Sequence, residues 1–291
     1  MSLFFFLKKQ DIMPENQRRL AGCINFLFSS QLFISICAAA FYCAGFKLQL
    51  GALNGLSVLR VVLVFAGTLA VYNITGFVMR FGIVSLARWL KKRTALMLAG
   101  ALLVLAVLVF LPIQMLDWKE ICYLGMLGLV SFLYNFPADL ELPAPPLRSV
   151  PLIKIVLIAF VWANLGAVYP AVSMDEMLGW KNFFYFLTFF SFIFSITLPF
   201  DIRDYYKDEK ARLLTFPRFI GIRKTKQLSI VAWLCFSLFS FLVSVSLWKI
   251  IVLSLFGIPL LLFSSPRRSH LYYTGLVDGL ILLLSVLLLL N

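Results

Sequence analysis

The feature that most constrains this chain is a series of long apolar segments that recurs from one end to the other. Each is close to the roughly 20 residues that a helix needs to cross about 30 Å of hydrocarbon. Because lipid offers no hydrogen-bonding partner to an open backbone, such segments cross a membrane as helices. The sequence therefore predicts an all-α, multi-pass transmembrane helical bundle of about nine helices, in a single membrane domain over 1–291. The predicted spans are 20–46, 54–76, 94–114, 121–136, 152–171, 182–200, 228–247, 249–264 and 272–290.

The composition also indicates that lipid is the solvent for most of the chain. Hydrophobic residues make up 62% of it and charged residues only 13%, which is too few to cover the outside of a soluble fold. A net charge of +13 would suggest nucleic acid as the partner of a soluble protein. In a membrane protein the placement of the charges matters more than their sum, so membrane lipid is expected as a partner and nucleic acid is not.

The basic residues gather in alternate connections between the apolar segments. If the N-terminus is cytoplasmic, most of the 26 Lys and Arg residues fall on the cytoplasmic side. This pattern predicts an integral membrane protein, as in a bacterial inner membrane, with a cytoplasmic N-terminus and an outward C-terminus. Cytoplasmic loops are expected at about 77–93, 137–151 and 201–227, after an interfacial segment at 1–19. The alternation favours nine spans, but only three residues separate the seventh from the eighth, so a count of eight stays open.

The sharpest polar feature is an acidic stretch at the end of the sixth apolar segment. It reads D-I-R-D-Y-Y-K-D over 201–208 and is followed by T-F-P and a glycine. If the helix continues past Pro199, then Asp201, Asp204 and Asp208 fall at i, i+3 and i+7 and share one face. Carboxylates that repel each other in this way indicate a cation, and Mg²⁺ with substrate phosphates is the usual one in diphosphate chemistry. A solvated patch balanced by nearby Lys and Arg is the other interpretation.

Residues 201–221 resemble the second aspartate-rich motif of the UbiA superfamily of intramembrane prenyltransferases. That motif reads approximately D-x-x-D-x-x-x-D, followed by T-L-P and a glycine. The stretch from L-Y-N-F-P, which begins at 133, through L-R-S-V-P-L-I-K, which ends at 154, is similar to the segment between the family's fourth and fifth helices. Nine helices, a cytoplasmic N-terminus and an outward C-terminus also agree with the family, so the resemblance covers nearly the whole chain.

The resemblance implies an activity and a set of site residues. In the family, two aspartate-rich motifs face each other across a cavity, and Mg²⁺ ions between them hold the diphosphate of an isoprenoid donor. The isoprenyl group then passes to a lipophilic acceptor. On this resemblance Asp201, Asp204 and Asp208 are the catalytic residues and the metal ligands. The residues expected to bind the diphosphate are Arg148, Lys154, Arg203 and Asn73, although ordinary anchoring at the cytoplasmic face would also explain the two arginines.

The first aspartate-rich motif is where the chain departs from the family. The end of the second span reads Y-N-I-T-G-F-V-M-R over 72–80, where the family has N-D-x-x-D, so Asn73 is the only remnant. No Asp or Glu lies between Glu15 and Asp117. Two alternatives to a prenyltransferase therefore stay open. One is a non-catalytic relative that binds an isoprenoid diphosphate or serves as an accessory subunit, and the other is a terpene cyclase of the same superfamily.

A further carboxylate, Asp278, lies inside the last apolar segment, where an ionisable residue is by default a candidate site residue. It could supply a charge that the first motif lacks, or it could be held by a hydrogen bond from Tyr272, Tyr273 or a neighbouring helix. His270 is the only histidine, which excludes a histidine pair and a Ser-His-Asp triad. A secondary transporter is disfavoured because the polar residues gather at one face of the membrane and not at its midplane.

Overall fold

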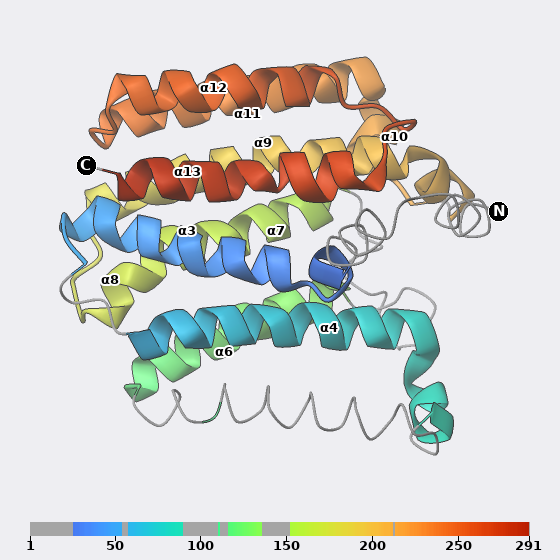
Figure 1. The fold of residues 1–291 in the computed structure, drawn as a ribbon, viewed down its shortest axis with the longest axis horizontal. Helices are drawn as coiled ribbons and strands as arrows, with labels where there is room; N and C mark the ends of the chain where they lie inside the picture. Colours follow the sequence, from blue (N-terminus) through green and yellow to red (C-terminus); the bar gives the residue numbers. More distant parts are fainter. Residues whose placement is uncertain are drawn as a thin grey trace, which may run out of the picture.

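The computed structural model consists of helices packed side by side (Figure 1). It describes residues 26–53, 58–89, 110, 116–135, 152–211 and 213–290, and it places no strand among them; for 74–89 and 132–135 it describes the backbone alone. The helices are α3 (Leu32–Leu50), α4 (Val58–Trp89), α6 (Trp118–Asn135), α7 (Ile153–Ala163), η2 (Asn164–Val168), α8 (Tyr169–Ser173), α9 (Trp180–Lys210), α10 (Phe216–Ile220), α11 (Ile222–Leu242), α12 (Leu247–Leu262), η3 (Tyr272–Val277) and α13 (Gly279–Leu289).

The predicted spans that fall on described residues coincide with helices. Five helical stretches in the described part are long and apolar enough to cross a membrane: α3, α7 through α8, α9, α11, and η3 through α13. Val58–Asn73 of α4 and the whole of α12 are shorter apolar helices. The span predicted over 94–114 lies outside the described residues except for residue 110, so a count of nine stays a prediction. The expected segment 1–19 and loop 137–151 also lie outside the described residues.

The segments predicted as cytoplasmic loops over 77–93 and 201–227 are largely helical in the structure, and their cytoplasmic placement stays a prediction. The loop expected over 77–93 is helical as far as Trp89, the last residue of α4. The loop expected over 201–227 contains the end of α9, all of α10 and the start of α11. Charged residues mark where a helix leaves the hydrocarbon, and they do not stop a helix that can continue into water.

α3 lies inside the bundle, with α4 on one side and α13 on the other (Figure 1). It also approaches η2 closely at Gly45, where an added Cβ atom would overlap the carbonyl oxygen of Gly166. Glycines at such a contact let two backbones approach each other, which is how membrane helices gain packing energy without a hydrophobic driving force. The centre of the bundle is therefore closely packed where α3 meets η2.

Helix α9 carries the acidic motif and contains Pro199, which would normally break or kink a helix. Proline has no N–H group, so the carbonyl oxygen of Ser195, four residues earlier, loses its usual helical partner. The hydroxyl of Ser229 on α11 donates a hydrogen bond of 2.6 Å to this oxygen, and both serines are buried. The neighbouring helix thereby satisfies the freed carbonyl, and α9 continues without interruption through the acidic motif to Lys210.

Candidate functional site

The acidic residues of the motif lie on the last three turns of α9, beside α10 and the beginning of α7, at the right-hand end of Figure 1. Because the helix continues past Pro199, the expected i, i+3, i+7 arrangement of Asp201, Asp204 and Asp208 on one face is present. Asp201 and Asp208 are buried, whereas Asp204 is partly exposed. The three carboxylates therefore form a row that runs from the interior of the bundle towards its end.

Two cations neutralise part of this row. Lys154 Nζ, in the first turn of α7, lies 3.1 Å from Asp201 Oδ1, and the Asp201 side chain is only 3% exposed. Arg203 donates two hydrogen bonds to Asp204, from Nε at 3.1 Å and from Nη2 at 2.8 Å. Such charge-assisted pairs hold both carboxylates and both cations in place. The side chains of Lys154 and Arg203 are each about a quarter exposed, so an incoming anion can reach them.

Asp208 borders a small cavity of about 20 Å³, which is enough for roughly one water molecule. The backbone after α9 folds back under it: Leu213 N–H donates to the Asp208 carbonyl oxygen at 2.9 Å, and Arg218 of α10 donates to the Leu213 carbonyl oxygen at 2.8 Å. The short segment after α9 is thus part of the site and not a free loop. The cavity is lined by Leu152, Lys154, Ile155, Asp201, Asp208, Leu213, Leu214 and Thr215.

The guanidinium of Arg203 also lies over aromatic rings. Its Cζ atom is 5.0 Å from the ring centre of Phe200 and 5.7 Å from that of Tyr273 in η3, which are cation–π distances. His270, just before η3, faces the same group. Desolvation lowers the pKa of His270 from its ordinary value and the positive charge of Arg203 lowers it further, whereas Asp204 acts in the opposite direction. This environment therefore disfavours the charged form of His270 beside Arg203.

Asp278 lies at the junction of η3 and α13, close to α3, where Cys37 Sγ donates to its backbone carbonyl oxygen at 3.9 Å. Its carboxyl group interacts electrostatically with Arg203, but no hydrogen bond or ion pair reaches it from the described part of the chain. The hydroxyls that the sequence suggested as partners bond elsewhere: Tyr272 donates to the Leu260 carbonyl oxygen and Tyr273 to that of Ser265. Asp278 thus makes no direct contact with the α9 motif among the described residues.

Asn73 is not brought into contact with this cluster in the described part of the chain. Asn73 uses its side-chain Nδ2 for two hydrogen bonds, to the carbonyl oxygens of Ser30 at 3.1 Å and Leu69 at 2.9 Å. Its amide therefore has only an oxygen left to offer, and an oxygen does not donate to phosphate. Arg148 lies outside the described residues, so its role in diphosphate binding stays a prediction.

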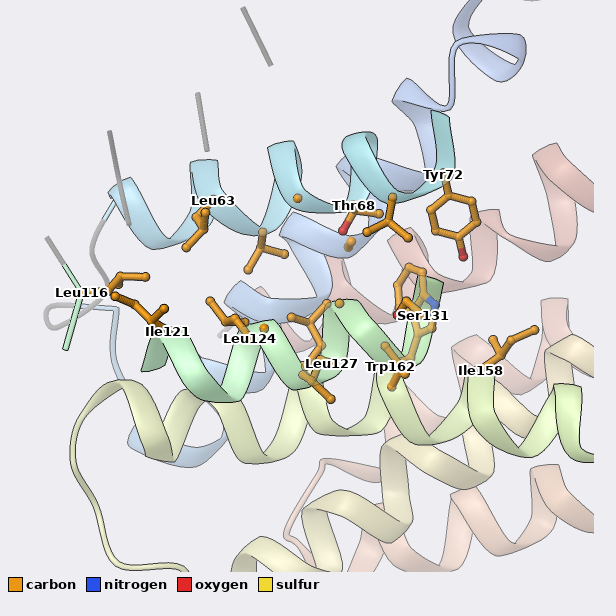
Figure 2. A pocket seen from close by; sticks show the side chains of 18 residues that line it. Leu63, Thr68, Tyr72, Leu116, Ile121, Leu124, Leu127, Ser131, Ile158 and Trp162 are labelled. Carbon is orange, nitrogen blue, oxygen red and sulfur yellow. The ribbon is translucent and has the colours of Figure 1, made fainter. Parts of the chain in front are cut away.

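A much larger cavity, of about 300 Å³, lies between α3, α4, α6 and α7 (Figure 2). Its walls are almost entirely aliphatic and aromatic, and the few hydroxyl groups among its labelled residues come from Thr68, Tyr72 and Ser131. One end is bounded by Leu116 and Ile121, and the other by Tyr72, Ser131, Trp162 and Ile158. A long apolar cavity with hydroxyls towards one end fits a ligand that has an apolar tail and a polar head.

The register of α7 connects this cavity to the acidic motif. Ile158, Val161, Trp162 and Leu165 line the cavity and recur at i, i+3, i+4 and i+7, so they form one face of the helix. Lys154 stands four residues before Ile158 and lies on the same face, about 6 Å further along the axis. The ammonium group that pairs with Asp201 is therefore aligned with the polar end of the cavity. The same i, i+3, i+4, i+7 spacing is visible in the sequence and is a signal that could have identified this cavity wall.

A model of the UbiA prenyltransferase family matches residues 85–275 of the chain. The chain belongs to the UbiA prenyltransferase family. The match includes both the acidic motif of α9 and Lys154 of α7, and it confirms the resemblance that the motif indicated. A comparison with curated proteins finds no significant match.

Solved structures of UbiA homologs have the same fold. One from Archaeoglobus fulgidus is 13% identical, with a TM-score of 0.60, over 91% of this chain and 98% of that one. The same homolog bound to GPP and Mg²⁺ is 14% identical, with a TM-score of 0.59 and the same coverage. An apo UbiA homolog from Aeropyrum pernix K1 is 12% identical, with a TM-score of 0.57, over 88% of this chain and 96% of that one. These likenesses show that this UbiA-family chain shares their fold.

The fold therefore raises the question of whether this UbiA-family chain can hold Mg²⁺. The described residues contain no group of three or more His, Cys, Asp or Glu side chains that could bind a metal ion by themselves. Asp201 and Asp204 already have cationic partners. Mg²⁺ at diphosphate sites needs only one or two carboxylates, because phosphate and water supply its other ligands. The α9 carboxylates fit one Mg²⁺ that arrives with a diphosphate, and they do not form a two-metal site in advance.

Proposed function

We propose that this chain binds an isoprenyl diphosphate at the end of α9 and transfers its isoprenyl group to a lipophilic acceptor. The observation that carries the proposal is the position of Lys154. This cation pairs with the buried carboxylate of Asp201 and stands on the same face of α7 as the residues that line the apolar cavity. A ligand with a diphosphate at Lys154 and a hydrocarbon tail in the cavity would use both features at once.

The roles of the residues follow from where charge develops. When the bond between the allylic carbon and the diphosphate oxygen breaks, the bonding electrons leave with the diphosphate. Lys154, held by Asp201, and Arg203 would stabilise that growing negative charge. The acceptor would then bond to the allylic carbon and lose a proton. The aliphatic walls of the cavity would keep water from capturing the carbon first.

Mg²⁺ is part of this proposal, because a UbiA homolog has been solved with GPP and Mg²⁺ and another structure of it with DMAPP and Mg²⁺. Asp204 and Asp208, the carboxylates nearest the end of the bundle, would hold it together with phosphate oxygens. A bound Mg²⁺ would neutralise charge on the leaving diphosphate. The cytoplasmic placement of this end of the bundle, expected from the basic residues, belongs to the same proposal.

The absence of acidic residues from one part of the sequence favours a second function. The sequence has no Asp or Glu between Glu15 and Asp117, where the family carries its first aspartate-rich motif. A chain that binds an isoprenyl diphosphate through Lys154, Arg203 and the α9 carboxylates, and does not cleave it, would serve as a binding or accessory protein. The two functions differ in whether a labelled isoprenyl group leaves its diphosphate.

The proposal is tested with the purified protein in lipid vesicles and an isoprenyl diphosphate labelled in its tail. Lys154→Gln should weaken binding and slow any transfer of label to lipid, whereas Lys181→Gln, at the opposite end of the bundle in the first turn of α9, should change neither. Label that moves into a new lipid product identifies a transferase, and tight binding without release of diphosphate identifies the non-catalytic function. Equal behaviour of the two lysine variants would contradict the assignment of Lys154.

A further inference from the structure

The apolar cavity has a defined end opposite Lys154. Arg60 of α4 and Glu120 of α6 form an ion pair there, with Arg60 Nε and Nη2 at 2.9 and 2.8 Å from the two carboxylate oxygens of Glu120. Glu120 is buried, and Tyr169 of α8 donates a further hydrogen bond to it at 3.3 Å. The pair and its tyrosine therefore tie α4, α6 and α8 together at this end of the bundle.

The helical register places this ion pair in line with the cavity walls. Arg60 precedes Leu63 by three residues, and Glu120 precedes Leu124 by four, so each lies one turn beyond a residue that lines the cavity and on the same face. An ion pair whose carboxylate is buried and bonded to both Arg60 and Tyr169 is an unfavourable neighbour for hydrocarbon. This ion pair does not itself line the cavity but lies about one turn beyond the lining residues Leu63 and Leu124, where it would act as a polar floor that an isoprenyl tail does not pass.

The width of the cavity depends on glycines. Gly67 of α4 and Gly125 and Gly128 of α6 line it, and a Cβ atom added at any of them would meet no described atom within 4 Å. Among the described residues, no close contact requires a glycine at these three positions, unlike at Gly45, where an added Cβ overlaps a neighbouring backbone. Their effect is to leave space that a bound chain can occupy.

The geometry points to a measuring site for chain length: the Arg60–Glu120 floor and the glycines above it select isoprenyl tails of about three to four units. This inference rests on the proposed function. Nine residues of α4 separate Leu63 from Tyr72, about 14 Å, and the turn of α7 from Ile158 to Lys154 adds about 6 Å. An isoprene unit extends by roughly 5 Å at ordinary carbon–carbon bond lengths. Farnesyl and geranylgeranyl diphosphate match the resulting length, and dimethylallyl diphosphate leaves most of the cavity empty.

The two glycines of α6 allow a graded test. Gly125 and Gly128 are three residues apart, which is about 4.5 Å along the axis and close to one isoprene unit. A leucine at Gly125 would block the cavity near the floor, and a leucine at Gly128 would block it one unit nearer to Lys154. The preferred tail should therefore shorten by about one unit in Gly125→Leu and by about two in Gly128→Leu. Leu129→Phe adds bulk to the same helix on an exposed side chain that does not line the cavity, so it is the matched control.

The experiment measures binding of two series of probes to the detergent-purified protein and its variants. Dimethylallyl, geranyl, farnesyl and geranylgeranyl diphosphates test the tail and the head together, and geraniol, farnesol and geranylgeraniol test the cavity without a diphosphate. We expect about a tenfold or greater loss of geranylgeranyl diphosphate affinity in Gly128→Leu, with geranyl diphosphate nearly unchanged, and the same order among the alcohols. Unshifted preferences in both leucine variants would overturn the measuring site.

The two series separate the two proposals. Alcohols that follow the predicted length preference, beside diphosphates that bind no better than the alcohols, would support the measuring site and contradict the proposed diphosphate site. Tight diphosphate binding with no effect of tail length would do the reverse. A uniform loss of all ligands in the leucine variants and in Leu129→Phe alike would indicate disturbed folding of α6 and would overturn the assignment of the glycines.

Discussion

Glu120→Gln is expected to destabilise the protein by about 3 kcal/mol. The substitution keeps the size of the side chain but removes the charge that accepts two hydrogen bonds from Arg60. Hydrogen bonds to charged groups contribute about 1.5–3 kcal/mol each, and breaking a buried ion pair costs about 3–5 kcal/mol. The Glu120 side chain is only 2% exposed, but Arg60 is 19% exposed and water can solvate it in part, so the lower end of the range applies.

Thermal unfolding of the detergent-purified protein measures this cost. For a chain of this size, about 3 kcal/mol corresponds to a fall of roughly 6 °C in Tm. The matched control is Lys119→Gln, the adjacent residue, whose ion pair with Asp175 is exposed on both sides and should leave Tm unchanged. A Glu120→Gln protein that unfolds at the same temperature as the Lys119→Gln protein would refute the reasoning that the Arg60–Glu120 pair holds this end of the bundle.

Two further substitutions test the packing around α9 and α11. Ser229→Ala leaves the carbonyl oxygen of Ser195 without its partner next to Pro199 and should cost about 1–3 kcal/mol in unfolding free energy, whereas Ser237→Ala, whose hydroxyl bonds within its own helix, should cost less. Gly257→Ala drives a methyl group into a buried indole ring of α11 and should cost about 1–3 kcal/mol relative to Gly279→Ala, where a Cβ meets no described atom. Both glycines are exchanged for the same better helix former, so their difference isolates the overlap. Equal unfolding temperatures within either pair would contradict the corresponding contact.

The all-helical fold with apolar helices of membrane-spanning length could be predicted from the sequence, because the length of the apolar segments follows from the thickness of the bilayer. The ends of the apolar segments do not give the ends of the helices α4 and α9, which extend beyond them. Hydropathy falls where Arg203 and Asp204 begin, but the backbone hydrogen bonds of the helix do not depend on hydropathy and continue to Lys210. Pro199 is tolerated inside α9 because a serine from another helix bonds the freed carbonyl.

The candidate site was predictable only where its residues are close in sequence. The row of carboxylates on α9 follows from a spacing of three and four residues. Lys154 and Asp201 are far apart in the chain, and so are Arg60 and Glu120. No local sequence pattern therefore predicts either ion pair. A residue at the expected motif position can also be engaged elsewhere. Asn73 stands at that position, but its side-chain N–H groups bond to backbone carbonyls.

The most direct test of the central claim is the binding of farnesyl diphosphate to the purified protein with and without Mg²⁺. It should be measured for the parent and for the double variant Asp204→Asn, Asp208→Asn, which keeps the shape of both side chains and removes their charges. The account predicts tight binding by the parent that weakens when Mg²⁺ is withdrawn and is lost in the double variant. Absence of binding, or binding that responds neither to Mg²⁺ nor to the loss of the two carboxylates, would contradict the diphosphate site at the end of α9.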